Sequence, residues 1–291
     1  MAEKVGKILT PADYNMLLTG PCLVRKPNGQ PLAIYLPDAM PTELRELGYP
    51  ILNELRSSTT QNRGMASGTK RVGSTEHGRT DSLPVPSAII GAFDPSGPQQ
   101  FCRLTAWTGQ ETEKFAALQP LFEWVGEQMR THVADRWQAQ MSYVEKTDPA
   151  WTIPGTPFTT ITVNNTYPTG VHTDKGDLDA GFSTIFCLRR GFYTGGCLTF
   201  PEYRVAVDMQ DGDLILMDAH EWHGNTQLNC ACGGPPRTKA GNPGPCSKCG
   251  AERISVVSYY RTKMAACGTP ADEAARQRAY AENRFEAARG R

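Results

Sequence analysis

The chain has 291 residues, of which 39% are hydrophobic and 21% are charged, and 30 basic side chains balance 30 acidic ones. This composition is typical of a folded globular protein rather than a disordered or fibrous one. A formal net charge of zero excludes a global basic field, so binding to nucleic acid would need a local basic patch. We expect no membrane segment, because no stretch approaches the ~18 consecutive apolar residues that a spanning helix needs.

The amino terminus and the cysteines indicate the compartment. The first 18 residues lack the apolar core and the small-residue cleavage site of a signal peptide. The nine cysteines are an odd number, and four of them cluster at metal-ligand spacing, which argues against a secreted disulfide scaffold. We therefore expect a protein of the cytoplasm, or of the nucleus if the host is eukaryotic, and a phage-encoded origin also fits.

Residues 1–150 are predicted to form a helical and mixed support region. Its first 55 residues combine short apolar runs with turns, and residues 41–55 are predicted to form one helix. Residues 56–80 are rich in Ser, Thr, Gly and basic side chains, among them Arg63, Lys70 and Arg71. This composition predicts a long basic loop, which is either simply solvated or becomes ordered on a phosphate backbone.

The clearest helical pattern lies in residues 110–145. Apolar side chains recur there at steps of three and four residues, at positions 121, 122, 125, 129, 133 and 137. Pro120 fits the first turn of a helix, where its missing N–H breaks no hydrogen bond. We expect this helix to cover one face of a sheet.

After residue 150 the pattern changes to short strands separated by Gly, Pro, Asn or Asp. They are predicted at residues 158–163, 182–188, 197–200, 204–207, 213–218 and 254–260. The connections are too short for crossover helices, so we expect an antiparallel sheet, as in a sandwich or jelly roll. Residues 266–291 begin near a Thr-Pro pair and predict a solvated carboxy-terminal helix.

A candidate metal site is carried by two short motifs. His172 and Asp174 lie two residues apart on an extended segment, so both side chains point to the same face. His223, on a later strand, can complete a facial set of two imidazoles and one carboxylate, which suits Fe(II) and leaves positions open for O₂. His220, three residues upstream, is the alternative for the second imidazole.

The residues around these histidines resemble the 2-oxoglutarate oxygenases. A Gly-Gly-Cys-Leu-Thr-Phe-Pro run occupies positions 195–201, a Gly-Asp-led apolar strand begins at 212, and Gly224 follows His223. The resemblance implies an α+β fold with a double-stranded β-helix (jelly roll, cupin-like) core at residues 151–265 and N-terminal helices packed on it. It also implies Fe(II) and 2-oxoglutarate as cofactors, and it favours His223 over His220.

An arginine is expected to bind the co-substrate. A buried guanidinium can hold the distal carboxylate of 2-oxoglutarate with two parallel hydrogen bonds. Arg253 begins the last predicted strand and Arg261 follows its end. The resemblance assigns the role to Arg253, with Arg261 as the alternative.

A cysteine block separates His223 from Arg253. Residues 230–249 carry Cys230, Cys232, Cys246 and Cys249 in a CxC and a CxxC pair joined by a basic loop rich in Gly and Pro. This spacing predicts a structural Zn(II) site in an insertion, because the segments left after its removal would meet through a short strand connection. Disulfides or free thiols are the alternatives.

The sequences at 158–188, 218–228 and 252–261 resemble the TET/JBP group of DNA pyrimidine oxygenases, particularly its small phage and microbial members. The resemblance implies oxidation of the 5-methyl group of 5-methylcytosine in DNA to the hydroxymethyl base, and possible further oxidation. Thymine, giving 5-hydroxymethyluracil, is the alternative substrate. A methyl group in a stacked duplex cannot reach a buried metal, so base flipping is expected.

The residues that would contact DNA are expected near the metal and on basic segments. Candidates for the flipped base or the backbone are Asn164, Asn165, Tyr167, Phe182, Trp222, Arg63, Lys70 and Arg71. The expected partners are DNA and O₂, for a monomer that contacts no membrane. Two other classes stay open: a hydroxylase of proteins or amino acids in the same superfamily, and a binding module with a degenerate metal site.

Overall fold

The computed structural model describes residues 1–57, 66, 85–97, 99–233, 246 and 248–289. Most of the predicted basic loop, including Arg63, Lys70 and Arg71, lies outside these residues, as does the middle of the cysteine block. Among the described residues, no helix has the length and hydropathy needed to cross a membrane.

The chain divides into two compact units, each assembled from three segments. The first unit comprises residues 1–88, 162–175 and 183–257, and the second comprises 89–161, 176–182 and 258–291. The division predicted from sequence, with boundaries near 150 and 265 and an insertion at 230–249, stays a prediction. The first unit contains all three candidate iron ligands, Arg253 and the four clustered cysteines.

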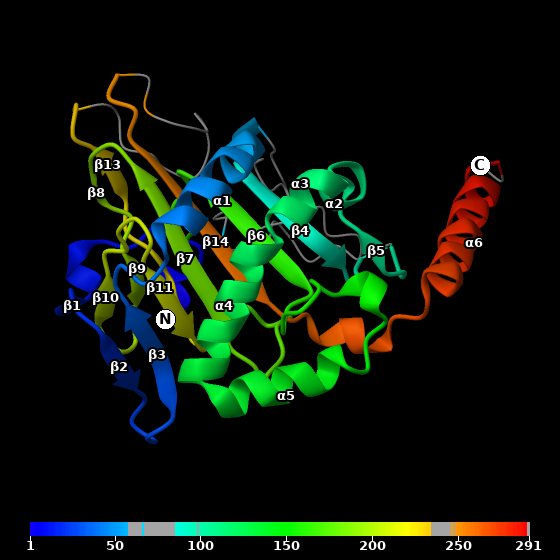
Figure 1. Ribbon diagram of the computed structural model, residues 1–291, viewed down its shortest axis with the longest axis horizontal. Helices are drawn as coiled ribbons and strands as arrows, with labels where there is room; N and C mark the ends of the chain where they lie inside the picture. Colours follow the sequence, from blue (N-terminus) through cyan, green and yellow to red (C-terminus); the bar gives the residue numbers. More distant parts are fainter. Residues whose placement is uncertain (58–65, 67–84, 98, 234–245, 247, 290–291) are drawn as a thin grey trace. The chain divides into compact units, whose positions relative to one another are not determined.

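The largest sheet has eight strands in the order β2-β3-β11-β7-β14-β6-β4-β5 (Figure 1). Its strands are β2 (Cys22–Arg25), β3 (Pro31–Leu36), β4 (Ser87–Phe93), β5 (Arg103–Leu104), β6 (Thr160–Asn165), β7 (Ser183–Arg190), β11 (Leu214–Met217) and β14 (Glu252–Tyr259). β4, β6 and β14 have residues in both units. β11 pairs antiparallel with both β3 and β7.

A second sheet has the order β1-β10-β9-β12, and β13 pairs with β8 in a two-stranded ribbon. These strands are β1 (Met16–Leu18), β8 (Tyr193–Gly195), β9 (Leu198–Phe200), β10 (Val205–Val207), β12 (Gly224–Asn225) and β13 (Leu228–Cys230). All six strands predicted from sequence are present, with ends shifted by at most two residues.

One core cluster joins the two sheets of the first unit. Every second residue of the central strands is buried in it, as in Ile185 and Cys187 of β7 and Leu198 and Phe200 of β9. This alternation follows from the period of two in a strand, which sends neighbouring side chains to opposite faces. The predicted α+β class with an antiparallel jelly-roll core is therefore confirmed.

The amino-terminal region differs from the expectation of turns and one helix. Helix α1 (Thr42–Glu54) lies where it was predicted, but three strands precede it. β1 belongs to the four-stranded sheet, and β2 and β3 belong to the eight-stranded sheet. β1 pairs in parallel with β10, bringing Met16 opposite Val205. Strands this short carry a weak sequence pattern, and their partners lie far along the chain, so their pairing is decided by tertiary contacts.

The second unit carries most of the helices. They are α2 (Ala106–Gln110), α3 (Thr112–Ala117), α4 (Gln119–His132), α5 (Ala134–Val144) and α6 (Pro270–Arg289). The helical pattern at 110–145 is three helices rather than one. Val133, at φ −140° and ψ 55°, leaves helical geometry between α4 and α5, and Leu118 separates α3 from α4. Pro120 lies in the first turn of α4, as predicted.

Short 3-10 helices occupy Ala2–Lys4, Pro11–Asp13, Leu55–Ser57, Pro149–Trp151 and Thr262–Ala266.

A disulfide in the second unit joins Cys102 to Cys267, a pair that was not predicted. The start of α6 lies beside it, where the buried carboxylate of Glu273 accepts hydrogen bonds from the backbone N–H groups of Cys102 and Gly268, both at 2.7 Å. α6 itself is the predicted carboxy-terminal helix, and it begins one residue after Thr269.

Candidate metal centre and co-substrate pocket

The structure brings His172, Asp174 and His223 together. One ligand atom from each lies within 4.8 Å of the other two. The Nε2 atoms of His172 and His223 lie 3.6 Å and 3.5 Å from the two carboxylate oxygens of Asp174, so both imidazoles face that carboxylate. Two nitrogens and one oxygen converging on one point form the arrangement expected of a facial Fe(II) site.

The backbone fixes this convergence. His172 and His223 are direct partners in an antiparallel bridge, and each backbone N–H donates to the carbonyl oxygen of the other, at 2.9 Å and 3.0 Å. Asp174 is anchored in turn, because its N–H donates to the Ala219 carbonyl. On the other side of the same segment, Val171 is bridged in parallel by Val5. The ligands are therefore held by main-chain bonds on both flanks.

Hydrogen bonds also select the imidazole nitrogen that faces the metal position. The Nδ1 atom of His172 lies 2.7 Å from the Gly170 carbonyl, and that of His223 lies 2.9 Å from the Glu221 carbonyl. A carbonyl only accepts, so both Nδ1 atoms carry the proton and both Nε2 atoms keep a lone pair. Neutral imidazoles with a lone pair on Nε2 are the form that binds a metal.

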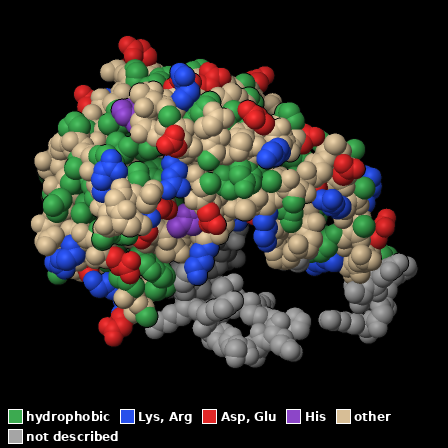
Figure 2. Space-filling model, turned by 90° about the horizontal axis from the view of Figure 1, so that it is seen from below, with side chains coloured by type: hydrophobic (Ala, Val, Ile, Leu, Met, Phe, Trp, Pro, Cys, Tyr) green, Lys and Arg blue, Asp and Glu red, His purple; other side chains and the backbone are tan. Residues whose placement is uncertain are grey.

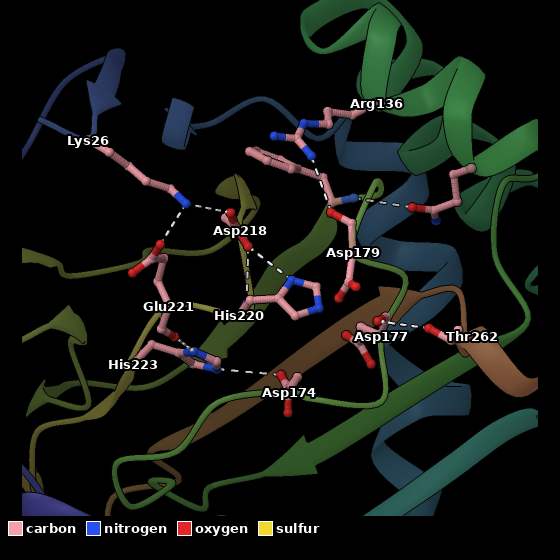
Figure 3. A network of polar contacts seen from close by, with 12 residues as sticks. Lys26, Arg136, Asp174, Asp177, Asp179, Asp218, His220, Glu221, His223 and Thr262 are labelled. Atoms are coloured by element: carbon pink, nitrogen blue, oxygen red, sulfur yellow. Dashed lines mark hydrogen bonds and ion pairs between the residues drawn. The ribbon is translucent and has the colours of Figure 1, made fainter. Parts of the chain in front are cut away.

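A cluster of charges supports the loop that carries His223 (Figure 3). The Lys26 ammonium lies 2.7 Å from Asp218 and 2.6 Å from Glu221, and all three side chains are largely buried. Glu221 is the residue whose carbonyl orients His223, and its carboxylate also accepts a hydrogen bond from the Tyr203 hydroxyl at 2.8 Å. Sequence reasoning missed Lys26, because nothing near it in the chain indicates a partner about 190 residues away.

His220, the alternative ligand, is engaged elsewhere. Its Nδ1 and its backbone N–H both lie 3.1 Å from one carboxylate oxygen of Asp218, and it is not part of the converging group. Burial alone would raise the pKa of Asp218, but hydrogen bonds from His220 and Lys26 outweigh it and hold that pKa well below its usual range. The Asp218 carboxylate is therefore charged at neutral pH and fully occupied as a structural acceptor.

Arg253 lies inside the jelly roll, and the described residues give its guanidinium no counter-ion. It is 5% exposed, and alternation along β14 puts it on the same face as Val257, which packs against the core cluster. Among the described residues, none accepts a hydrogen bond from its guanidinium. Burial raises the pKa of the neighbouring thiols of Cys187 and Cys197, so both stay neutral at pH 7 and cannot balance the charge.

Arg261, the alternative anchor, is already paired. Its Nη2 atom donates to both carboxylate oxygens of Asp94 at 3.2 Å, and Asp94 is 4% exposed. Gly176 lies close to the guanidinium. A Cβ atom placed on this glycine would lie 2.5 Å from Nη1. The structure thus favours Arg253 as the arginine left to bind a carboxylate from outside the chain.

The two glycines before Cys197 are favoured by their backbone conformation, and Gly195 also by a close approach. Gly195 and Gly196 have φ values of +75° and +71°, a region that side chains disfavour. A Cβ atom on Gly195 would lie 2.0 Å from the Gln227 carbonyl oxygen, and one on Gly196 would lie 3.7 Å from the Arg253 side chain. The Gly-Gly motif therefore lets β8 turn into β9 beside Arg253.

The predicted base-contact residues are mostly buried. Asn164 accepts a hydrogen bond from Ser87 at 2.8 Å, Asn165 donates to Glu252 at 3.0 Å, and the Tyr167 hydroxyl donates to the Ala66 carbonyl at 2.7 Å. Phe182 is buried in the second unit, and Trp222, beside His223, is half-buried. A role for these five residues in binding a base stays a prediction.

The four clustered cysteines also converge. Their Sγ atoms all lie within 4.8 Å of one another, and a tetrahedral ZnS₄ centre with Zn–S bonds of ~2.3 Å needs S···S separations of ~3.8 Å. Hydrogen bonds from the Lys248 amide, the Cys230 thiol and the Cys249 amide lower the pKa of Cys246 to about 6, which favours the thiolate that binds metal, whereas a hydrogen bond with Cys249 raises the pKa of Cys230 to about 12. The described residues record no disulfide among the four.

The cysteine cluster adjoins the start of β14. Cys230 ends β13, and the Cys246 backbone N–H donates to the Ala251 carbonyl at 2.9 Å, one residue before β14 begins. Cys230 and Ala251 share a small buried cluster with Tyr193 and Leu228. A metal held by these cysteines would therefore fix the strand that presents Arg253.

The family of the chain follows from a match to a family model. The model named Tet_JBP, described as the oxygenase domain of the 2OGFeDO superfamily, matches residues 94–262, more than half of the chain. The chain belongs to this family. The predicted resemblance to the TET/JBP group is thereby confirmed, and the matched segment includes the converging triad, Arg253 and Arg261.

Individual relatives give the same result. The chain is 35% identical over 180 residues to "Thymine dioxygenase JBP1" of Leishmania braziliensis, covering 61% of this chain and 20% of the relative. It is 30% identical over 257 residues to the protein of the same name from Leishmania tarentolae, covering 88% of this chain and 27% of the relative. The chain therefore spans about a fifth to a quarter of the length of these curated relatives.

A solved structure shares the fold. NgTET1 in complex with 5mC DNA superposes with a TM-score of 0.58 at 16% identity, covering 89% of this chain and 81% of that chain. At this identity the similarity shows the fold alone.

Proposed function

We propose that this protein is an Fe(II)- and 2-oxoglutarate-dependent dioxygenase that oxidises the 5-methyl group of a pyrimidine in DNA. The observation that carries the proposal is the pairing of a converging His-Asp-His group with a buried arginine that has no counter-ion in the described residues. Family membership supplies the reaction class. The relatives at 30–35% identity are named thymine dioxygenases, so thymine becomes the first substrate to test, ahead of 5-methylcytosine.

The residues fit the metal that the family implies. His172, Asp174 and His223 would hold Fe(II), because both imidazoles turn Nε2 toward Asp174 and their Nδ1 protons are bound by backbone carbonyls. The Asp174 side chain is 33% exposed, so the centre is reachable from solvent. Three protein ligands leave the remaining positions for co-substrate and O₂.

The residues also fit 2-oxoglutarate. An unpaired buried cation is unfavourable in the free protein, and an arriving carboxylate removes that penalty. Arg253 would bind the distal carboxylate of the co-substrate in the interior of the jelly roll. Iron, 2-oxoglutarate and O₂ together supply the oxidation of an unactivated C–H bond, with succinate, CO₂ and a hydroxymethyl base as products. The protein contributes orientation and the exclusion of water around the reacting methyl group.

DNA would have to present a flipped base. Trp222 is the best placed of the predicted base contacts, since it precedes His223 and keeps part of its side chain exposed. Acidic and basic side chains are interspersed on the described part of the face in Figure 2, so the described residues form no single-sign field there. The proposed backbone contacts are therefore the basic loop at 56–80 and the cysteine block, with Arg63, Lys70 and Arg71 as predicted phosphate ligands.

We also propose that the four cysteines hold one structural Zn(II). What supports it is the convergence of the Sγ atoms, together with the lowered pKa of Cys246. Its role would be to fasten the end of β13 to the start of β14.

The test of the proposed reaction uses the full chain with Fe(II), 2-oxoglutarate and three matched DNA duplexes. One contains thymine, one contains 5-methylcytosine with uracil replacing thymine, and one contains only uracil and unmethylated cytosine. Mass spectrometry of the nucleosides and succinate release are measured together. We expect a hydroxymethyl base and stoichiometric succinate from at least one methylated duplex, and neither product from the third.

The metal ligands are tested in the same assay. His223→Ala is expected to abolish product and metal binding, whereas His220→Ala keeps metal binding within a few-fold. If no methylated duplex yields an oxidised base while a proline-containing peptide stimulates succinate release, the DNA proposal is wrong and the superfamily's hydroxylase activity takes its place. Product formation that survives His172→Ala would overturn the metal site.

A further inference from the structure

The hydroxyl group of Tyr193 is buried, and the described part of the chain gives it no partner. The residue is 1% exposed, and its oxygen has no hydrogen-bond partner among the described residues. Buried hydroxyl groups are nearly always satisfied, because leaving one unpaired costs the full desolvation of that group. A tyrosine retained in such a position therefore indicates a ligand that supplies the missing acceptor.

Tyr193 shares its surroundings with Arg253. Burial raises the pKa of Tyr193. The positive charge of Arg253 lowers that pKa by a smaller amount. The hydroxyl therefore stays protonated at neutral pH and is able to donate. A Cβ atom placed on Gly196 would lie 3.4 Å from Leu228, which shares a buried cluster with Tyr193, and 3.7 Å from the Arg253 side chain. One buried region thus holds two donors, a guanidinium and a hydroxyl, and the described residues offer neither of them an acceptor.

The ring of Tyr193 is held rigidly. The guanidinium of Arg189 lies 3.7 Å from the ring centroid, and its Nη2 atom donates to the Tyr193 carbonyl at 2.5 Å. On the neighbouring strand, the backbone of Tyr193 is paired with Cys230 in the β8–β13 ladder. A donor that is already fixed loses little conformational entropy when it binds a ligand, which suits a specificity-determining contact.

We propose that the Tyr193 hydroxyl and Arg253 together bind the distal carboxylate of the co-substrate, and that Tyr193 makes the pocket selective for 2-oxo acids with a second carboxylate. This rests on the proposed function, because it takes 2-oxoglutarate to be the co-substrate. Two hydrogen bonds from Arg253 and one from Tyr193 would satisfy a carboxylate on both of its oxygens. The distal carboxylate would then meet three donors inside the core, whereas 2-oxobutyrate, which lacks that group, would leave them all unpaired.

The experiment compares Tyr193→Phe with Tyr35→Phe. Tyr35 is a matched control, because it is a buried tyrosine of the same core whose hydroxyl donates to Asp213 at 2.6 Å. Binding of 2-oxoglutarate and of 2-oxobutyrate is measured by calorimetry with Mn²⁺ in place of Fe(II), without O₂. Thermal unfolding of each metal-free protein is recorded in parallel.

Tyr193→Phe is expected to weaken 2-oxoglutarate binding roughly 10- to 100-fold, since a hydrogen bond to a charged group is lost. It should leave 2-oxobutyrate binding unchanged and should not lower the melting temperature, because its hydroxyl has no partner to lose. Tyr35→Phe should do the reverse, lowering the melting temperature and keeping the affinity for 2-oxoglutarate. In turnover, Tyr193→Phe should raise the KM for 2-oxoglutarate and leave the KM for DNA unchanged.

Two outcomes separate this inference from the proposed function. If the wild-type protein binds 2-oxoglutarate and Tyr193→Phe binds it equally well, Tyr193 is not part of the pocket and the inference is overturned. If the wild-type protein with Mn²⁺ binds no 2-oxoglutarate, the proposed function itself fails.

Discussion

Arg253 lies at the start of strand β14 and Arg261 lies just after its end, and the two side chains have opposite surroundings. Arg253, near the start of the strand, is buried without an acceptor among the described residues, whereas Arg261, just after its end, donates to both oxygens of Asp94. Arg253 is 5% exposed and the Arg261 side chain is 31% exposed, and among the described residues only Arg261 has a counter-ion. Because an unpaired buried charge lowers the stability of the free protein, its retention indicates binding, and a paired charge indicates structure.

Removing Arg253 should have the largest effect on co-substrate binding. Arg253→Met is expected to weaken 2-oxoglutarate binding by at least ~100-fold, because a bidentate charged contact is lost. The melting temperature of the metal-free protein should stay the same or rise, since the substitution removes an uncompensated buried charge. Calorimetry and thermal unfolding measure the two effects. A clear fall in stability with normal binding would show that Arg253 has a structural partner and does not differ from Arg261 in this respect.

Removing Arg261 should reverse this pattern. Arg261→Met leaves the buried Asp94 carboxylate without its cation, and we expect a loss of about 2–4 kcal/mol in the free energy of unfolding. The affinity for 2-oxoglutarate should stay within about threefold of wild type. Urea denaturation with the same calorimetric assay checks both. A large loss of affinity with intact stability would instead identify Arg261 as the anchor.

Removing the proposed zinc should weaken the binding of 2-oxoglutarate at Arg253 and leave the Arg261–Asp94 ion pair intact, because the cysteine cluster adjoins the start of β14. Cys246→Ser and Cys249→Ser together are expected to abolish zinc content and to raise the KM for 2-oxoglutarate about 3- to 10-fold. Metal analysis and steady-state kinetics measure these effects. An unchanged KM in a zinc-free protein would show that the cluster does not position the anchor.

The smallest expected effect concerns a second paired cation, Lys26. Lys26→Met should cost about 1–2 kcal/mol of stability at pH 7, because Asp218 and Glu221 lose a buried partner. Since the folded-state pKa of Asp218 lies below its unfolded value of about 3.9, its contribution is complete above that pH and is lost as the pH falls. The difference between Lys26→Met and wild type should therefore shrink below about pH 4. Urea titrations at pH 7 and pH 3.5 measure it, and a constant difference would contradict the assignment.

The two arginines also show where sequence reasoning succeeds and where it stops. The strands around them were predictable, because alternating apolar residues and Gly or Pro breaks carry a local pattern. Composition does not decide between Arg253 and Arg261, since both lie at the ends of one strand. The residue that distinguishes them is Asp94, which pairs with Arg261 from about 160 positions away. In the sequence only the family resemblance favours Arg253, and among the described residues Arg261 is the one paired with a carboxylate; the role of Arg253 stays a prediction.

The candidate metal ligands were proposed from short motifs. His172 and Asp174 were chosen because a strand places alternate residues on one face, and His223 was preferred to His220 because the family resemblance has a glycine after this histidine. Lys26 and Tyr193 were missed, since the importance of each depends on an ion pair or an absent partner that exists only in three dimensions. The break between α4 and α5 was missed for a related reason, because the apolar positions from 121 to 137 continue across it.

The strands near the amino terminus set a limit on how this protein can be shortened. β3 covers one edge of β11 and β1 covers one edge of β10, while Val5 and Leu9 bridge the segments that carry the metal ligands. A fragment cut at residue 94, where the family match begins, would expose both of these edges to pairing with other molecules. Residues 1–57 and 85–289 hold complementary strands of the same sheets, so the two pieces are suited to fragment complementation, with iron binding as the report of reassembly.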